Sequence, residues 1–450
     1  MASFRFLHAA DLHLDSPFRG MAQVPESYRE RLRESTFTAF SNLIDLAIRE
    51  HVDFIVLSGD IYDASDRSLR AQLRLQRGLS RLAGHHIPVY IIHGNHDPED
   101  GVQAQLDWPA NVHFFGSKEV TAKTVFRGGR SQVDTDAAAE GSVEPLAVVC
   151  GISYASMALN DNVAKSYQRL PHSELYHIGL LHGNVDGDPN HDNYAPCAKR
   201  ELIESGIDYW ALGHIHMREI LHEQEPWIVY PGNIQGRSVK EHGAKGCYIV
   251  DVAADKQAEL TFCPLDDVRW HVVNLSIEGV NTEQELKNRL DLAMERLRET
   301  SEDRMKIVRF MMTGRGPLHR KLEQPGFVQE LLQALREEEE HRAEASESYL
   351  IWVESLQVQT GLALDMETLK EQDSFLGELF RLSIQAEQDV DLFTELMNES
   401  LISVQGTARL RQLTEDMVNS EGQTWLERAR ELAAVLLEDA SEGQAGGDAS

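Results

Sequence analysis

The sequence lacks the features of a membrane-spanning or exported protein. Of its 450 residues 42% are hydrophobic, but no apolar run reaches the roughly 18 residues that are needed to span a bilayer. The first residues, MASFRFLHAADLH, contain neither a basic leader nor a cleavable apolar segment. We therefore expect a cytoplasmic protein without a membrane partner.

Cysteine is scarce as well, which argues against a disulfide framework. The chain has four cysteines, which are widely spaced and form no C-x-x-C pair: Cys150, Cys197, Cys247 and Cys263. This spacing predicts reduced thiols, as is usual in a cytoplasm.

Basic residues are few compared with acidic ones. The 43 Lys and Arg against 73 Asp and Glu give a net charge of −30, whereas phosphate backbones attract Lys and Arg. The charge is uneven, because residues 331–450 contain 26 acidic and 8 basic residues, while 15 of the 19 histidines precede residue 223. A histidine-rich first part and an acidic last part predict two different roles.

A chain of 450 residues is expected to form two or three domains. Short apolar runs alternate with polar or helical stretches over the first 265 residues, which predicts α/β layering. Next, WHVVNLSI and MKIVRFMMTG predict two strands around a helix that a capping box, Thr282 to Glu285, opens. The expected domains are residues 1–265, a small unit at 266–325, an acidic helical region at 326–440 and a disordered tail at 441–450.

Seven apolar runs in the first part predict strands, and several of them end in residues that bind metals. The runs are FRFLHAA, VDFIVLSG, IPVYIIHG, LAVVCGI, HIGLLHG, IDYWALG and WIVYPGN. Open α/β sheets place ligands beyond the carboxyl ends of their strands. We therefore expect the polar residues that follow five of these runs to converge: Asp11 and His13, Asp60 and Asp63, Asn95 with His96 and Asp97, His182, and His214 with His216.

The mixture of these side chains indicates a metal centre. Carboxylate oxygen, amide oxygen and imidazole nitrogen together suit divalent manganese, iron or zinc, and seven candidates exceed what one tetrahedral site uses. Two metals that share a bridging carboxylate can clamp a phosphate and support an in-line displacement. The seven candidates are Asp11, His13, Asp60, Asn95, His182, His214 and His216.

Each motif alone has a simpler explanation. A lone D-x-H is usually a surface turn, and G-D-x-x-D alone is hardly more specific. The occurrence of all the motifs in order, each at the end of a strand-like run, favours the metal centre. Asp15 stays open between the rim of the site and a turn before Pro17, and we favour the turn.

Through DLH, GDIYD, GNHD, LLHGN and GHIH, residues 4–240 resemble the calcineurin-like metallophosphoesterases. The resemblance implies a four-layer α/β/β/α sandwich with two metals. The implied ligands of the first metal are Asp11, His13, Asp60 and His216, and those of the second are Asp60 as the bridge, Asn95, His182 and His214. It also implies that His96 is a catalytic acid or transition-state donor beside the scissile phosphate. Asp97 or another nearby carboxylate would orient it.

Further features resemble the SbcD-type DNA-repair nucleases, with most likeness to the YhaO group of bacteria. They are DLHLDSPF, YPGNIQGR and the small unit at 270–313. The resemblance implies a manganese-dependent exonuclease, with endonuclease activity as a further option, that works as a subunit beside an SbcC-type coiled-coil ATPase. It implies that the small unit caps the active site, that the C-terminal helices dock on the ATPase, and that the protein forms a homodimer. A helical bundle packed on the catalytic domain is the alternative for the C-terminal helices.

Contacts to a phosphate or to DNA are less well defined. Some of these nucleases have histidine where this chain has Asp63, a possible phosphate contact, so either the role of Asp63 differs or another residue supplies the contact. Arg19 and Arg237 lie beside metal motifs. Five arginines spaced 3, 4, 3 and 4 residues apart lie on one helical face, which either contacts DNA or is simply solvated: Arg67, Arg70, Arg74, Arg77 and Arg81.

Two rival functions remain beside a DNA nuclease. The first is a small-molecule or protein phosphatase on the same scaffold, which would need basic residues to hold the extra charge of a monoester. The second is a binding subunit whose chemistry has lapsed, which the intact candidate ligands argue against.

Overall fold

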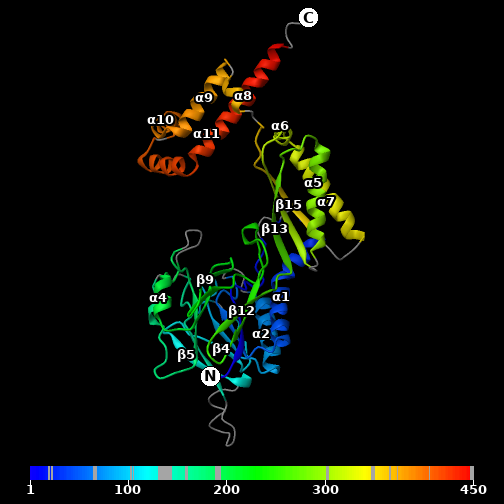
Figure 1. Cartoon of the computed structure of the whole chain (residues 1–450). Helices are drawn as coiled ribbons and strands as arrows, with labels where there is room; N and C mark the ends of the chain where they lie inside the picture. The colour runs from blue at the N-terminus through cyan, green and yellow to red at the C-terminus, as the bar shows by residue number, and fades with distance from the viewer. Residues whose placement is uncertain are drawn as a thin grey trace, which may run out of the picture. The chain divides into compact units, whose positions relative to one another are not determined.

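The structure is a computed structural model that describes residues 1–18, 21, 24–63, 68–101, 104, 106–129, 144–157, 161–187, 194–300, 304–345, 350–363, 366–371, 373–404 and 406–445. The chain divides into two compact units (Figure 1). The first unit comprises Met1–Val273, Thr300–Arg309 and Gln333–Ser355, and the second comprises Asn274–Glu299, Phe310–Leu332 and Leu356–Ser450.

Two six-stranded sheets form the centre of the first unit. In spatial order the first sheet consists of β12 (Ala258–Pro264), β11 (Gly246–Val252), β1 (Phe4–Ala9), β2 (Phe54–Ser58), β3 (Val89–Ile92) and β4 (Val112–Phe114). The second consists of β5 (Thr121–Phe126), β6 (Pro145–Gly151), β7 (Tyr176–His182), β8 (Tyr209–Gly213), β10 (Trp227–Tyr230) and β9 (Glu219–Glu223). The strands β1 to β4 run parallel, as do β6, β7, β8 and β10.

Alternating side chains place each sheet between two apolar cores. In β1, Phe4 and Phe6 pack between the sheets, where the ring of Phe6 lies 5.2 Å from that of Phe54 and 5.2 Å from that of Tyr209 (centroid distances). Leu7 of the same strand faces the opposite side, toward helices α1 (Glu26–Arg49) and α2 (Leu69–Gly84).

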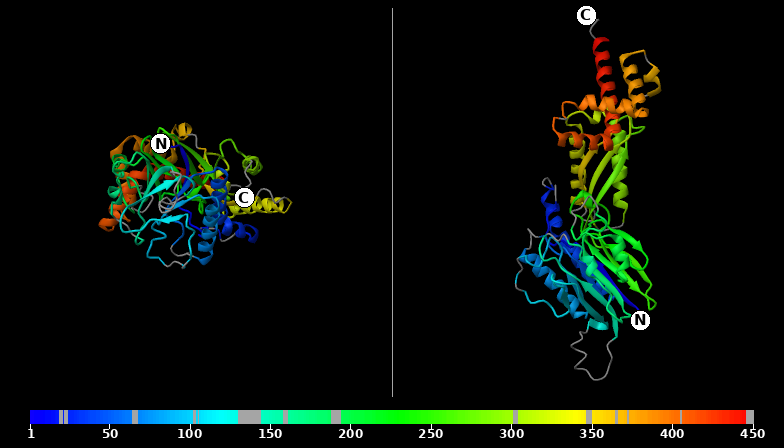
Figure 2. Two further views of the ribbon diagram at one scale, coloured as in Figure 1. Left: turned by 90° about the horizontal axis from the view of Figure 1, so that it is seen from below. Right: turned by 90° about the vertical axis from the view of Figure 1, so that its left-hand side faces the viewer.

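The outer face of the second sheet has a core of its own. There Trp210 of β8 packs with Leu202 of the short helix α4 (Lys199–Glu204). The expected four-layer α/β/β/α arrangement is therefore confirmed, and Figure 2 shows it from two further directions.

All seven apolar runs form strands, at β1, β2, β3, β6, β7, β8 and β10. Sequence reasoning did not identify β11 and β12, an antiparallel pair that extends the first sheet. The segment 120–146 begins with β5, which pairs antiparallel with β6, and residues 130–143 lie outside the described part of the chain.

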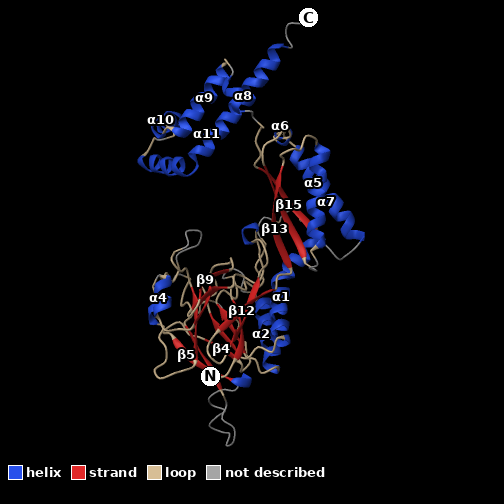
Figure 3. Ribbon diagram, viewed as in Figure 1, coloured by secondary structure: helices blue, strands red, loops and turns tan. Residues whose placement is uncertain are grey.

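The small unit that follows is an α/β structure with three strands. Its sheet has the order β13 (Val268–Ser276), β14 (Met305–Thr313) and β15 (Ile351–Val358) (Figure 3). The helix between the first two strands, α5 (Glu283–Glu299), begins at the expected capping box, because Thr282 Oγ1 accepts from the Glu285 N–H at 3.2 Å and the Thr282 N–H donates to Glu285 Oε2 at 3.3 Å.

The expectation of an entirely helical region over 326–440 is wrong at β15. This strand follows α7 (Phe327–Ala345) and joins the small sheet, because its apolar side chains, such as Ile351 and Val353, are buried. Sequence reasoning missed it because a strand of this length stands alone in an otherwise acidic, helical stretch.

The remaining elements of the C-terminal part are helices. The short α6 (His319–Leu322) precedes α7, and α8 (Met366–Glu371), α9 (Phe375–Gln388), α10 (Val390–Leu401) and α11 (Ala408–Ala445) follow β15. Helix α9 packs against α8, α10 and α11. Because α11 runs to Ala445, the first half of the tail expected to be disordered is helical, and residues 446–450 lie outside the described chain.

All four cysteines are free thiols. Among the described residues, no helix combines the length and the apolar character that crossing a bilayer requires.

His8 provides a test of how the two sheets are joined. Its ring bridges them from β1, with Nδ1 3.0 Å from the Tyr209 hydroxyl and Nε2 3.2 Å from the Leu212 carbonyl oxygen. Burial lowers the pKa of His8 to about 3. The unfolded chain protonates this histidine below about pH 6.5 and the folded chain does not, so the folded state loses stability as the pH falls through this range, by about 2 kcal/mol at pH 5.

In a His8→Gln variant we therefore expect a lower Tm at pH 7.5 but a smaller further decrease between pH 7.5 and pH 5 than in the unaltered protein. Thermal unfolding at both pH values measures this. The exposed His172→Gln is the control and should keep the full decrease. An equal decrease in His8→Gln would contradict the assignment.

Candidate metal centre

The site begins where β1 and β2 end. Past these strands the backbone pairing continues, with the Asp11 N–H donating to the Gly59 carbonyl at 3.1 Å and the His13 N–H to the Asp60 carbonyl at 3.0 Å. Asp11, His13 and Asp60 all have positive φ angles, between 41° and 51°, which are uncommon for residues other than glycine. Strained backbone of this kind gathers at functional sites.

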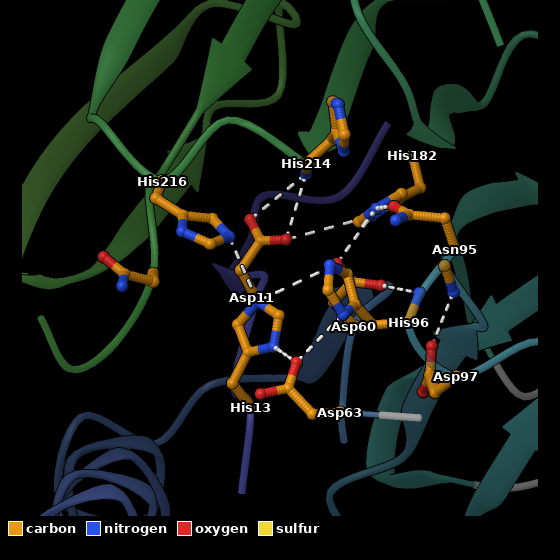
Figure 4. A network of polar contacts seen from close by, with 12 residues as sticks. Asp11, His13, Asp60, Asp63, Asn95, His96, Asp97, His182, His214 and His216 are labelled. Atoms are coloured by element: carbon orange, nitrogen blue, oxygen red, sulfur yellow. Dashed lines mark hydrogen bonds and ion pairs between the residues drawn. The ribbon is translucent and has the colours of Figure 1, made fainter. Parts of the chain in front are cut away.

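Asp60 lies at the centre of the site, and its side chain is 1% exposed (Figure 4). Its Oδ1 accepts the His96 N–H at 2.9 Å. Its Oδ2 lies 3.3 Å from His182 Nε2 and 3.8 Å from His13 Nε2, but no hydrogen bond to it forms among the described residues. A buried carboxylate oxygen without a hydrogen bond is costly, and a cation at this position would remove the cost.

His13 and His216 face each other with the same ring atoms. Their Nε2 atoms are 3.0 Å apart. The Nδ1–H of His13 donates to Asp63 at 2.8 Å, and that of His216 donates to Glu241 at 2.7 Å. Both Nε2 atoms therefore present lone pairs to the same point, an arrangement that becomes favourable when a proton or a metal ion lies between them.

These contacts complete a first group of candidate ligands. One ligand atom from each member lies within 4.8 Å of those of the others: Asp11, His13, Asp60 and His216. This is the set that the sequence resemblance implies for the first metal.

His182 belongs to a second group of candidate metal ligands. Its Nδ1–H donates to the Ser58 carbonyl at 2.9 Å, so its Nε2 faces the site, 2.9 Å from Asn95 Oδ1 and 3.3 Å from Asp60 Oδ2. The backbone N–H of His214 donates to Asp11 at 3.0 Å, and its ring lies edge-on to that of His182 at 5.3 Å between centroids. Asp60 is shared by both groups, as a bridging ligand would be.

The donor set fits two divalent metal ions. It combines carboxylate, imidazole and amide donors, and the Nδ1 atoms of His13, His182 and His216 are bound to oxygen acceptors that fix their tautomers. Asp11, His13, Asp60 and His216 would hold one ion, and Asp60, Asn95 and His182, with His214 beside them, the other.

The electrostatics of the site agree with this. Burial raises the pKa of Asp11 to about 6. Burial also lowers the pKa of His13 to about 4, assisted by the charge of Arg237. At His182 burial is outweighed by the nearby Asp60 and Asp11 carboxylates, which raise its pKa to about 9. The site thus favours positive charge at His182, beside the two carboxylates, and keeps the His13 imidazole neutral.

Two glycines allow the strand ends to come this close. A Cβ on Gly213 would lie 2.0 Å from the Ser58 carbonyl oxygen, and one on Gly94 would lie 2.3 Å from Asp60 Oδ1. Any side chain at these positions would push the second sheet away from the first or displace the central carboxylate.

His96 lies at the edge of the cluster, with a side chain that is 42% exposed. Its Nδ1 is 3.0 Å from Asp63 Oδ1, and this hydrogen bond raises the pKa of His96. Asp97 has different partners, because it accepts the N–H groups of Gly94 at 2.7 Å and Ile61 at 3.0 Å. The carboxylate that orients His96 is therefore Asp63, one of the nearby carboxylates that the sequence left open beside Asp97.

Asp63 is saturated by its neighbours. Besides the two imidazoles it accepts from the Ser16 hydroxyl, and Arg237 Nη1 donates to its Oδ2 at 2.9 Å. These contacts favour a positioning role over contact with a phosphate. Asp15 accepts from Ser68 at 2.5 Å in a turn with a φ of 68°, in agreement with the turn interpretation.

The arginines of α2 contact the neighbouring helix. Arg70 pairs with Glu34 of α1, Arg74 lies 3.5 Å from the same carboxylate, and Arg81 pairs with Asp45 at 2.6 Å. Contacts within the protein thus account for their helical spacing, which supports the interpretation that this face is simply a solvated one, and contact with DNA stays a prediction. Arg77 is exposed, whereas Arg19 and Arg67 lie outside the described residues.

Sequence reasoning missed Glu241 and Lys245. Lys245 donates to the His216 carbonyl at 2.7 Å. Both residues lie in VKEHGAKG, which has no recognisable spacing to the GHIH motif. A carboxylate 25 residues after a metal-binding histidine is too common in an acidic chain to be singled out.

Two protein families match this chain. Residues 4–218 match the calcineurin-like phosphoesterases, and residues 270–361 match the middle domain of the metallophosphoesterase YhaO. The chain is 38% identical over 381 residues to the metallophosphoesterase YhaO of Bacillus subtilis (strain 168). The aligned residues cover 84% of this chain and 87% of that one. It therefore belongs to the calcineurin-like metallophosphoesterases and fits their YhaO group.

More distant relatives are similar as well. The chain is 25% identical over 301 residues to the DNA double-strand break repair protein Mre11 of Sulfurisphaera tokodaii, covering 65% of this chain and 70% of that one. Among solved structures, TT1561 of Thermus thermophilus superposes with a TM-score of 0.30 at 11% identity, over 58% of this chain and 99% of that one.

The position of Asp60 predicts that one substitution weakens both metal sites. We expect the metal-depleted protein to take up two equivalents of Mn²⁺ and to gain about 2.7 kcal/mol of stability per site at a hundredfold excess over Kd. In Asp60→Asn both binding events should weaken, because the shared carboxylate is lost. Titration calorimetry and thermal unfolding with and without Mn²⁺ measure this.

Asp161→Asn removes the same charge at an exposed position and is the control. It should bind two equivalents with unchanged affinity. Two intact sites in Asp60→Asn would contradict the bridging arrangement.

Proposed function

We propose that this metallophosphoesterase hydrolyses phosphodiester bonds of DNA with two divalent metal ions. It would act as an exonuclease, with endonuclease activity as a second mode, in DNA repair. The observation that carries the proposal is the pair of ligand groups sharing Asp60, with the Asp63–His96 pair beside them. The likeness to Mre11 proteins supports DNA as the substrate.

The protein's own side chains supply the proton chemistry. When bound, a pair of metals polarises the phosphate and lowers the pKa of the attacking water. The Nδ1 of His96 is engaged by Asp63, so its Nε2 is the atom that gives a proton to the departing oxygen. Because Asp63 raises the pKa of His96, this imidazole is protonated over more of the neutral pH range than a free one.

The charges beside the site favour a diester over a monoester. A monoester carries an additional negative charge, which free cationic side chains would have to balance. Arg237 is already bound to Asp63 at 2.9 Å, and Arg70 is bound to Glu34 and lies 3.3 Å from Asp15. The phosphatase alternative therefore has less support than the diesterase. Manganese is the metal that the resemblance implies, and it is compatible with the mixed oxygen and nitrogen donors.

Exposed apolar side chains on the C-terminal helices support a docking role for this region. On α11, Leu410, Leu413 and Met417 are exposed at helical spacing, within the acidic C-terminal region of residues 331–450. We propose that these helices dock on an SbcC-type coiled-coil ATPase, whose basic surfaces would hold the DNA that this acidic chain does not attract. The homodimer stays a proposal from the resemblance.

The nuclease proposal predicts that a single substitution separates metal binding from catalysis. We expect the purified protein to degrade end-labelled linear duplex DNA with Mn²⁺ at low salt. His96→Asn should lower the rate by about 10²–10⁴-fold, the usual contribution of a general acid, while two equivalents of Mn²⁺ still bind. His172→Asn is a matched control at an exposed position.

A comparison of small substrates distinguishes the rival. The bis-nitrophenyl phosphate diester should be hydrolysed faster than the nitrophenyl phosphate monoester. A preference for the monoester, together with intact DNA, would favour a phosphatase. Failure to bind metal at all would favour the lapsed binding subunit.

The docking proposal predicts that a charge introduced among Leu410, Leu413 and Met417 prevents assembly with the ATPase. Leu413→Glu should abolish co-elution with the SbcC-type ATPase and leave hydrolysis of the diester unchanged, because the helix is remote in sequence from every ligand. Gln412→Glu adds the same charge at the adjacent exposed position and should assemble normally. Co-elution of Leu413→Glu would refute this docking surface.

A further inference from the structure

We propose that Glu241 is a positioning residue of the metal centre, acting through His216, and that Arg237 joins it to the Asp63–His13 pair. This inference rests on the metal dependence proposed above, but it does not depend on the identity of the substrate.

The contact between Glu241 and His216 sets the direction of the imidazole. Glu241 Oε1 lies 2.7 Å from His216 Nδ1 and accepts a hydrogen bond from the Nδ1–H group. The Nε2 of the same ring then presents its lone pair to the site, 3.0 Å from His13 Nε2. Carboxylates bound to the remote nitrogen of a metal-binding histidine fix its tautomer and make it a stronger ligand.

Glu241 is itself held in place. Its Oε2 accepts the Arg237 N–H at 2.6 Å and the Asn233 side-chain amide at 3.0 Å. Asn233 is fully buried, and Glu241 ends a short 3-10 turn, Val239–Glu241. With both oxygens bound, the carboxylate has little freedom to rotate away from the imidazole.

The backbone of His216 is held by the same segment. Lys245 Nζ donates to the His216 carbonyl at 2.7 Å. On the other side Gly232 has a φ of +74°, and a Cβ there would lie 2.7 Å from the same carbonyl oxygen. Residues at both ends of the connection between β10 and β11, Gly232 and Lys245, therefore contact the His216 carbonyl and hold its backbone in place.

Arg237 connects this pair to its counterpart. Its Nη1 donates to Asp63 Oδ2 at 2.9 Å, and its Nη2 lies 3.9 Å from Glu241 Oε1. Asp63 in turn accepts from His13 at 2.8 Å. One largely buried guanidinium thus lies between the two carboxylates that orient the facing imidazoles, and it fixes their separation.

The test measures metal binding without substrate. Full-length protein is depleted of metal and titrated with Mn²⁺. We expect Glu241→Gln to weaken one of two sites by about 10–100-fold, the usual cost of losing such a partner, and to leave the other unchanged. Hydrolysis of bis-nitrophenyl phosphate should decrease at low Mn²⁺ and recover at saturating Mn²⁺, which a merely structural defect would not produce.

Two further variants keep the inference falsifiable. Glu241→Asp retains the charge but withdraws the carboxylate from Nδ1, and should show a smaller loss at the same site. Glu219→Gln removes a carboxylate at an exposed position of β9 and should bind Mn²⁺ normally. Unchanged Mn²⁺ affinity in both Glu241 variants would overturn the proposal, whatever the activity toward DNA.

The Arg237→Gln variant distinguishes two roles of Arg237, a link between the two carboxylates and a contact to the phosphate. As a link between the carboxylates, Arg237 is needed for metal affinity, so Mn²⁺ binding should weaken without substrate. A raised KM for the diester with unchanged Mn²⁺ affinity would instead make Arg237 a phosphate contact and refute the link.

Discussion

The structure depends on the burial of negative charge at Asp60. A carboxylate that is 1% exposed, with one oxygen outside any described hydrogen bond, is unfavourable unless positive charge lies beside it. The raised pKa of His182 is one response of the protein to this demand. A metal ion satisfies it more fully, because it can contact several donors at once. Folding therefore prepares the site, and metal binding removes the cost.

The layered fold produces this concentration of charge by bringing two sets of strand ends together. His8 and Ser58 of the first sheet hydrogen-bond to β8 of the second, Ser58 Oγ at 2.9 Å from the Ala211 carbonyl. The apolar core between the sheets fixes their separation, and Gly213 permits contact at the carboxyl ends. The same packing that stabilises the sandwich thus positions His182 against Asp60, so stability and site geometry share their residues.

Patterns within a few residues were sufficient to predict the central strands and the residues that gather at their ends, because each motif follows an apolar run. The partners of those residues were not predictable in the same way. Asp63 orients His96, and Glu241 orients His216 across 25 residues of chain. Such pairs depend on loop conformation, which periodicity does not encode. Likewise the arginine stripe of α2 has the spacing of a binding face, but Glu34 and Asp45 of α1 neutralise it.

The internal pairing of arginine limits how this acidic chain could attract DNA, its proposed substrate. With Arg70, Arg74, Arg81 and Arg237 engaged by carboxylates of the protein itself, attraction to a phosphate backbone must come from another source. Under the proposed function, metal ions at the site would supply it locally, and only for the scissile phosphate. Long-range attraction would have to come from a second protein. Such a division would restrict cleavage to DNA that the partner has already bound, and the acidity of the chain would then be a source of specificity.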